Sequence, residues 1–213
     1  MLNRLIYTTF GLLLAIVPAT AQTVQQTAPS SDNPELTRLF NEDQRVRVAK
    51  PLEPDEPKIT RKDADREALV KQMLAHDQVI TKADDLHAAV ILQHSHDASD
   101  ILVAHTLAVL CASDRDKTCL FLAAATLDRY LQYIHQPQIF GTQYVHFDHP
   151  PVTQAPYADD AISDFLRNKF GLPSLEQQKK RLEEINSRST AGQGTSLPAS
   201  QSVTPPPKGP GNK

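Results

Sequence analysis

The apolar residues of this chain are concentrated in one stretch, residues 83–144. Three segments within it are apolar almost all the way round a helix, and such a helix is buried inside a protein. The pattern predicts core helices over residues 83–93, 99–112 and 117–134. Residues that favour helix caps occupy the joins: Ser99, Asp100, Asp114 and Asp116. Because the joins are short, we expect consecutive helices to run antiparallel.

Weaker helical patterns precede the core. Asn33 and Pro34 are typical of a helix start, and the spacing of Leu36, Leu39, Phe40 and Asp43 predicts a helix over residues 34–46. Three prolines predict an extended linker over residues 50–58. A capping box at Thr60 and Asp63 then indicates a surface helix. The helix has a narrow apolar stripe, and its charged residues, Arg66 among them, are expected to face solvent. The stripe consists of Ala64, Ala68, Leu69, Gln72 and Met73.

The pattern after the core is less regular. A segment rich in Pro and Gln follows residue 134, and Gly141 within it permits a turn with positive φ. We expect an ordered loop or short hairpin that crosses the bundle. Two further helices are predicted over residues 158–170 and 174–186, the second begun by a capping box of Ser174 and Gln177. The predicted fold is therefore all-α: a compact antiparallel helical bundle with helical-hairpin packing.

The two ends differ in composition from the single domain expected over residues 32–186. Residues 1–21 resemble a secretory signal peptide, with Arg4 before an apolar run and an Ala19-Thr20-Ala21 cleavage pattern. An uncleaved anchor is the alternative, although the run is short of the roughly 20 apolar residues of a membrane span. Residues 22–31 are expected to be flexible. Residues 187–213, rich in Ser, Thr, Pro and Gly, are expected to form a disordered tail.

Charge and aromatic content narrow the classes of partner. The net charge is -3, with no basic stripe or polybasic block, so a nucleic-acid partner is not expected. The chain has no Trp and only 6% aromatic residues, which argues against a stacking platform for sugars or bases. No cofactor is indicated, and no membrane span is expected once the signal peptide is removed. The partner is left as an unidentified protein or small-molecule ligand.

Cys111 and Cys119 are the only cysteines of the chain. A C-x7-C spacing does not fit a zinc knuckle or a thioredoxin-like motif, whereas exported proteins commonly pair such cysteines. We favour a structural disulfide between two helix ends over a pair of buried thiols. It would place the cysteines at one pole of the core.

Polar residues that are unusual in such apolar surroundings map to the opposite pole. They come from the first join, the second and third core helices and the following loop: Gln93, His94, His96, His105, Asp128, Arg129, Thr142 and Gln143. Charges in apolar surroundings need partners, because an unpaired buried ion is costly. The favoured interpretation is that Arg129, Gln143 and Asp128 hold the loop. The alternatives are a binding site, or a catalytic pocket in which Asp128 orients His94 and Arg129 holds an anion.

The eight histidines require a separate test for metal binding. His87 and His94 are two helical turns apart, so they share a face but are too distant to chelate one ion. His146, Asp148 and His149 are weak candidate ligands on a loop. The chain has no H-E-x-x-H helix and no paired Glu-x-x-His motif. No metal site is predicted.

Four short motifs occur in an order that resembles an uncharacterised family of bacterial exported domains. They are Glu42-Asp43-Gln44-x-x-Arg47, Leu92-Gln93-His94, Ala125-x-x-Asp128-Arg129 and Gln138-Ile139-Phe140-Gly141-Thr142-Gln143. Phe140 stands where the family usually has Tyr, and this removes a hydroxyl group. The resemblance covers about residues 35–145. It implies the position of a site and export from the cell, but no activity.

The sequence thus favours an exported, periplasmic or extracellular bacterial protein that acts as a binding or scaffolding module of the cell envelope. A hydrolase-like enzyme that uses His94, Asp128 and Arg129 is the alternative. No nucleophile motif such as G-x-S-x-G or S-x-x-K accompanies these residues.

Overall fold

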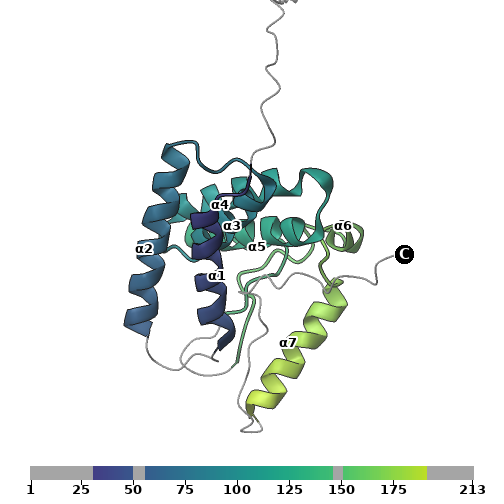
Figure 1. Ribbon diagram of the computed structural model, residues 1–213. Coiled ribbons are helices and arrows are strands. Elements are labelled where there is room, and N and C mark those ends of the chain that lie inside the picture. Colours follow the sequence, from purple (N-terminus) through teal and green to yellow (C-terminus); the bar gives the residue numbers. More distant parts are fainter. Residues whose placement is uncertain (1–30, 50–55, 146–150, 191–213) are drawn as a thin grey trace, which may run out of the picture.

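Figure 1 shows a computed structural model that describes residues 31–49, 56–145 and 151–190. Within these ranges the regular elements are all helices, which confirms the all-α bundle. They are α1 (Pro34–Ala49), α2 (Glu56–Ala75), α3 (Lys82–Leu92), α4 (Ala98–Cys111), the 3-10 turn η1 (Ala112–Asp114), α5 (Lys117–Tyr133), α6 (Asp164–Lys169) and α7 (Leu175–Thr190). Several predictions lie outside the described residues: the signal peptide, residues 22–30 of the flexible segment, residues 50–55 of the linker, the candidate ligands His146, Asp148 and His149, and residues 191–213 of the tail.

Helices α3, α4 and α5 form the core, each within two residues of its predicted bounds at either end. The caps differ in part from those predicted. Thr81 and Asp84 form a capping box at the start of α3, and Asp97 caps α4 through the N–H of Ser99. Asp116 caps α5, as the sequence indicated. Alanines let the three helices pack closely, and several are fully buried: Ala88, Ala89, Ala104, Ala108 and Ala124.

Helix α4 is not buried on every side, which corrects the expectation from its composition. Leu102, Val103, Val109 and Leu110 are each at least 40% exposed. These residues lie at helical spacing on one face, while Ile101, Ala104 and Leu107 face the core. The apolar exterior of α4 shows that periodicity cannot assign burial when a helix has no polar face for comparison.

Helices α1 and α2 stand side by side across the core (Figure 1). Leu36, Leu39 and Asp43 of α1 are buried, as their spacing predicted. The start of α2 was predicted too late: the helix begins at Glu56, because a proline in a first turn has no N–H to leave unbonded. Of its predicted apolar stripe Met73 is buried, but the rest of the buried face was predicted wrongly. Arg66 and Val70 are buried, whereas Ala64 and Ala68 are exposed.

The disulfide between Cys111 and Cys119 closes the join of α4 and α5, with a Cα–Cα distance of 5.6 Å. Nearby, Lys82 contacts Asp114 and Asp116 across the same end of the bundle. The opposite pole is marked by the α3–α4 join and the end of α5, where the hydroxyl of Tyr133 donates to the carbonyl of Ser95 at 3.3 Å. The two-pole arrangement predicted from the short joins is thus present.

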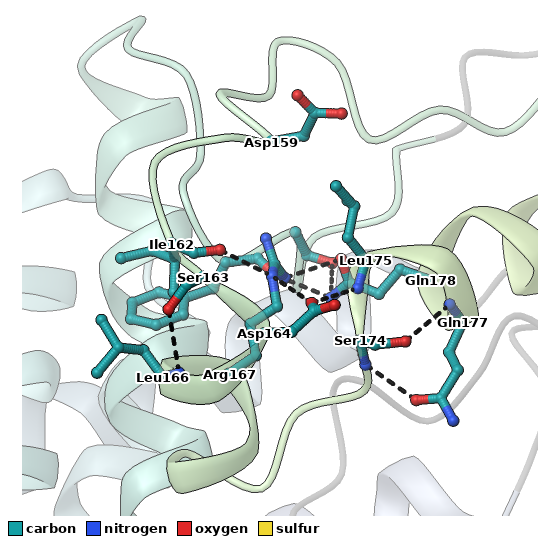
Figure 2. Close-up of polar contacts among 12 residues, drawn as sticks. Asp159, Ile162, Ser163, Asp164, Leu166, Arg167, Ser174, Leu175, Gln177 and Gln178 are labelled. Carbon is teal, nitrogen blue, oxygen red and sulfur yellow. Dashed lines mark hydrogen bonds and ion pairs between the residues drawn. The ribbon is translucent and has the colours of Figure 1, made fainter.

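After α5 the chain forms an ordered loop and two further helices. Val145 and Thr153 pair as a short antiparallel bridge, and Gly141 has a φ of 70°, as expected for its turn. Helix α6 begins at Asp164 rather than at 158, because Ser163 caps it through the N–H of Leu166 (Figure 2). The capping box of Ser174 and Gln177 opens α7 as predicted. Helix α7 reaches Thr190, so residues 187–190 are helical and not part of a disordered tail.

Candidate functional site

Arg129 brings together the polar residues of the predicted pole. Its Nη1 donates to the carbonyl of Gln93 at 2.7 Å, and its Nε and Nη2 donate to Oε1 of Gln143 at 3.3 and 3.2 Å. Arg129, in the C-terminal half of α5, therefore connects the end of α3 to the loop. Two regions lie on either side of it. We call them the loop network and the His94 cluster.

The loop network begins at Asp128, whose carboxylate holds the turn at Gly141. One oxygen accepts from the N–H groups of Ile139 and Phe140 at 2.8 and 2.9 Å. The other accepts from the N–H and the hydroxyl of Thr142 at 2.9 and 2.7 Å. Burial nevertheless raises the pKa of Asp128, because desolvation outweighs these four bonds. Both oxygens of this carboxylate are committed to the loop.

Arg167 and Gln178 hold the same turn from the C-terminal helices. Arg167 is fully buried; its Nη1 donates to the carbonyl of Phe140 at 2.8 Å, and its Nη2 to the hydroxyl of Tyr157. Gln178 Nε2 donates to the Phe140 carbonyl at 2.8 Å. Figure 2 shows Arg167 and Gln178 converging between α6 and the start of α7. A buried arginine ringed by acceptors anchors these helices to the loop.

Two glutamines complete the network. Gln138 Oε1 accepts from the N–H of Gln143 at 2.9 Å, and its Nε2 donates to the carbonyls of Gln143 and Gln154. Gln154 Nε2 donates to the carbonyl of Gly141. Gln143 Nε2 donates to the carbonyl of Ala125 at 3.0 Å. The loop network, defined as Asp128, Gln138–Gln143, Gln154, Arg167 and Gln178, is thus a structural unit with its side chains bonded to the backbone of the loop.

The His94 cluster lies on the other side of Arg129, where α1 and α2 cover the end of α3. It comprises Asp43, Arg47, Asp63, Arg66, Gln93 and His94. Asp43 is at its centre: its carboxylate accepts two hydrogen bonds from Arg47 Nε, at 3.2 and 3.1 Å, and one from Nη2 at 2.9 Å. Arg66 Nη2 lies 3.5 Å from Asp43 Oδ1, and His94 Nε2 lies 3.8 Å from Oδ2. Asp63 accepts from both arginines.

Asp43, and not Asp128, is the carboxylate beside His94. Among the residues that the structure describes, no ion pair joins His94 to Asp128, whose oxygens face the loop. The catalytic arrangement envisaged from the sequence, with Asp128 orienting His94, is therefore not the one observed. The distance of 3.8 Å between His94 and Asp43 is also too long for a hydrogen bond.

Among the residues that the structure describes, three buried nitrogen atoms of the His94 cluster find no hydrogen-bond partner. They are Arg66 Nε, Gln93 Nε2 and His94 Nε2. The residues Arg66 and Gln93 are 5% and 2% exposed, and the side chain of His94 is 5% exposed. Folded proteins pair nearly all buried polar atoms, and each exception costs about 1–3 kcal/mol. The His94 cluster thus differs from a purely structural network.

The cluster and the adjoining Arg129 together have an excess of positive charge. Arg47, Arg66 and Arg129 face only two carboxylates, those of Asp43 and Asp63. Within the described residues Arg129 makes no ion pair with any carboxylate, and its bonds go to a carbonyl and an amide oxygen. Burial, together with the charge of Arg47, lowers the pKa of Arg129 to about 10. The charge of this arginine is therefore incompletely compensated.

His94 is neutral in these surroundings. Burial, and then the positive charges of Arg47, Arg129 and Arg66, hold the pKa of His94 well below its usual value of 6.5. A neutral imidazole has one nitrogen that donates and one that accepts. His87, two turns earlier, lies on the same face as predicted: it stacks on Phe40 of α1 with ring centroids 4.2 Å apart.

The other predicted site residues lie outside the cluster. His96 is exposed, with Nδ1 3.4 Å from the Tyr133 hydroxyl. His105 lies between α4 and α5, with Nδ1 3.0 Å from the carbonyl of Ala123. Thr142 and Gln143 belong to the loop network. In the part of the chain that the structure describes, no group of His, Cys, Asp and Glu is arranged to hold a metal ion.

Sequence reasoning missed Arg66 and Asp63 and gave Asp43 and Arg47 no site role. Arg66 was predicted to lie on the solvent-exposed face of α2, although it lies four and seven residues before the buried Val70 and Met73. That spacing was the signal that put Arg66 on the inner face. Asp43 and Arg47 belong to the first motif of the family resemblance and are four residues apart, so they share a helix face.

Comparisons of the chain with protein-family models, curated proteins and solved structures returned no match. Among the described helices, none is long and apolar enough to span a membrane.

Proposed function

We propose that this protein is an exported binding or scaffolding module of the bacterial cell envelope, and that its ligand or partner engages the His94 cluster. The observation that carries this proposal is the group of three buried nitrogens without partners, on Arg66, Gln93 and His94. Buried donors without acceptors are rare in folded chains, and a bound molecule that supplies acceptors removes their cost.

Export is supported by two features. Residues 1–21 have the pattern of a signal peptide. Cys111 and Cys119 form a disulfide across one helix join, and such bonds persist in oxidising compartments outside the cytosol. Both fit a protein of the periplasm or the extracellular space.

A binding role fits the His94 cluster better than catalysis. The alternative is a hydrolase-like enzyme in which His94 is the base and Asp43 takes the place envisaged for Asp128. The low pKa of His94 favours this alternative, because a neutral imidazole can accept a proton. Against it, no hydroxyl or thiol of the described residues bonds to His94 Nε2, and Asp43 is too distant to orient the ring by a hydrogen bond.

A thermal-shift screen of the chain without residues 1–21 against metals and metabolites tests the proposal. Compounds that bind the folded state raise Tm. We expect at least one to raise the Tm of the wild-type protein and of a His96→Ala control, whose histidine lies on the same join, but not of His94→Ala. A His94→Gln variant serves if the alanine variant fails to fold.

The outcomes separate the two functions. If no compound acts through His94, or if all variants respond equally, the proposed site is wrong. A compound that binds through His94 is then incubated with the protein and recovered for mass spectrometry. Recovery of the unchanged compound supports a binding module, whereas a His94-dependent hydrolysis product favours the enzyme.

A further inference from the structure

The unpartnered atoms of the His94 cluster share one chemical property: they are donors. Arg66 Nε and Gln93 Nε2 carry hydrogen atoms and cannot accept a hydrogen bond. The carboxylate of Asp43, 3.8 Å from His94 Nε2, favours the tautomer of His94 that carries its hydrogen on that nitrogen. A molecule that completes the cluster therefore has to supply acceptor atoms.

The charges around these donors indicate the sign of that molecule. The two arginines of the cluster, Arg47 and Arg66, match its two aspartates, and the adjoining Arg129 adds one positive charge without a carboxylate partner among the described residues. Arg129 lies beside Gln93 through a 2.7 Å bond to its carbonyl. Hydrogen bonds from cationic donors to an anionic oxygen are about twice as strong as neutral ones.

The two aspartates do not already fill this role. Asp43 accepts from Arg47 and from Gln44 Nε2 at 2.9 Å, and Asp63 accepts from Arg47 and Arg66 Nη2. Their carboxylates leave Arg66 Nε, Gln93 Nε2 and His94 Nε2 without an acceptor. The two aspartates thus compensate the charges of Arg47 and Arg66. They leave the charge of Arg129 uncompensated and the three donors without an acceptor.

Given the binding role proposed above, we propose that the ligand presents a carboxylate or phosphate group to Arg66, Gln93 and His94, with Arg129 supplying the uncompensated positive charge. The side chains of Arg47 and Asp63 are the most exposed charged members of the cluster, at 16% and 14%, and this pair marks the side from which the anionic group would approach.

Isothermal titration calorimetry with three small probes tests this chemistry at constant ionic strength. Inorganic phosphate and acetate carry the two anionic groups, and acetamide is the neutral match of acetate. We compare the wild-type protein with Gln93→Met, which removes an amide donor without changing the charge, and with Arg66→Lys, which keeps the charge and removes Nε. Arg45→Lys is the control, because Arg45 is an exposed residue of the same helix α1 that carries Asp43.

We expect phosphate or acetate to bind the wild-type protein and the Arg45→Lys control, and acetamide not to bind. Loss of one donor should weaken binding about tenfold in Gln93→Met and in Arg66→Lys. Which of the two anions binds more tightly identifies the group. Equal affinity of the anions for wild type and both site variants would overturn the inference, as would no binding of any anion, which would leave ordered water as the partner of these donors.

The failure of this inference can be told from the failure of the proposed function. If a neutral or cationic compound of the thermal-shift screen binds through His94 while the anions do not, the anionic chemistry is wrong and the binding role stands. If no compound of any charge binds through His94, both are wrong.

Discussion

The loop network and the His94 cluster lie on either side of Arg129 and treat buried polar atoms in opposite ways. In the loop network a single carboxylate, Asp128, accepts four hydrogen bonds, and Gln138 uses both ends of its amide. In the His94 cluster three buried nitrogens have no hydrogen-bond partner within the described part of the chain. The first arrangement fixes a conformation. The second leaves donors for another molecule.

The comparison shows why an aspartate-arginine pair in a helix is not by itself a site. Asp128 and Arg129 are adjacent, yet Asp128 turns to the loop and Arg129 bridges to the end of α3. Among the described residues, the buried side-chain atoms without a hydrogen-bond partner belong to Arg66 of α2 and to Gln93 and His94 at the end of α3. The difference between the two regions can be tested by substitutions on each side.

The largest effect is expected for Asp128→Ala. The substitution leaves the N–H groups of Ile139, Phe140 and Thr142 without their acceptor, and each buried orphan costs about 1–3 kcal/mol. We expect the free energy of unfolding to fall by more than about 3 kcal/mol, measured by chemical denaturation. Asp114→Ala, on the surface beside Lys82, is the control and should change it far less, because an exposed ion pair is screened by solvent. Equal effects would show that Asp128 does not hold the loop.

Gly141→Ala is expected to be the next most destabilising. At a φ of 70°, a Cβ on residue 141 would lie 2.6 Å from Tyr157 and 2.7 Å from Gln178, so the loop network has to move. Gly171→Ala is a matched control: its φ is 71°, but its nearest neighbour would be 3.9 Å away. In the control the free energy of unfolding should fall by about 1–2 kcal/mol, because a residue with a Cβ disfavours the left-handed backbone. In Gly141→Ala it should fall clearly further. Similar losses in thermal denaturation would mean that the turn is not tightly enclosed.

The pH dependence of stability probes the His94 cluster. The folded state disfavours a proton on His94, which faces Arg47 of α1, Arg66 of α2 and Arg129 of α5. The unfolded chain takes up that proton below its ordinary pKa of about 6.5, so the stability should fall as the pH drops through this value. His94→Gln should reduce this loss.

Half-buried His87 also makes the protein less stable as the pH falls, because burial lowers its pKa too. The pH profile of His87→Gln is therefore the control for the same variant series. If the His94→Gln profile coincides with that of the wild-type protein in denaturation from pH 7 to pH 5, His94 is not held neutral by the cluster.

Much of the fold could be predicted from the sequence because local signals determine it. The three core helices, the disulfide and the capping box of Ser174 and Gln177 each depend on residues close together in the chain. The meeting of Gln93 and Gln143 on Arg129 followed from the short joins between those helices. The exposed face of α4 did not follow, because Leu102 and Val109 resemble core residues wherever they lie.

The composition of the site could be predicted only in part. His94, Gln93 and Arg129 were identified, but the partners of His94 come from α1 and α2, and a helix with a weak apolar stripe gives little indication of how it is rotated. Whether Arg66 and Asp63 face His94 depends on the rotation of α2 about its axis. The role of Asp128 depended on a different long-range fact, the path of the loop around its carboxylate.

The most direct test of the central claim is the free energy of unfolding of Gln93→Met without ligand, compared with that of Gln138→Met. Both substitutions remove a buried amide of similar size, but Gln93 Nε2 has no partner and Gln138 makes three hydrogen bonds to backbone groups. In denaturant titrations we predict that Gln93→Met keeps or raises the free energy of unfolding, by up to about 3 kcal/mol, because the apolar residue removes the cost of an unpartnered donor. For Gln138→Met we predict a loss of about 2–4 kcal/mol. Equal losses for the two would contradict the account, because the amide of Gln93 would then serve the fold and not a ligand.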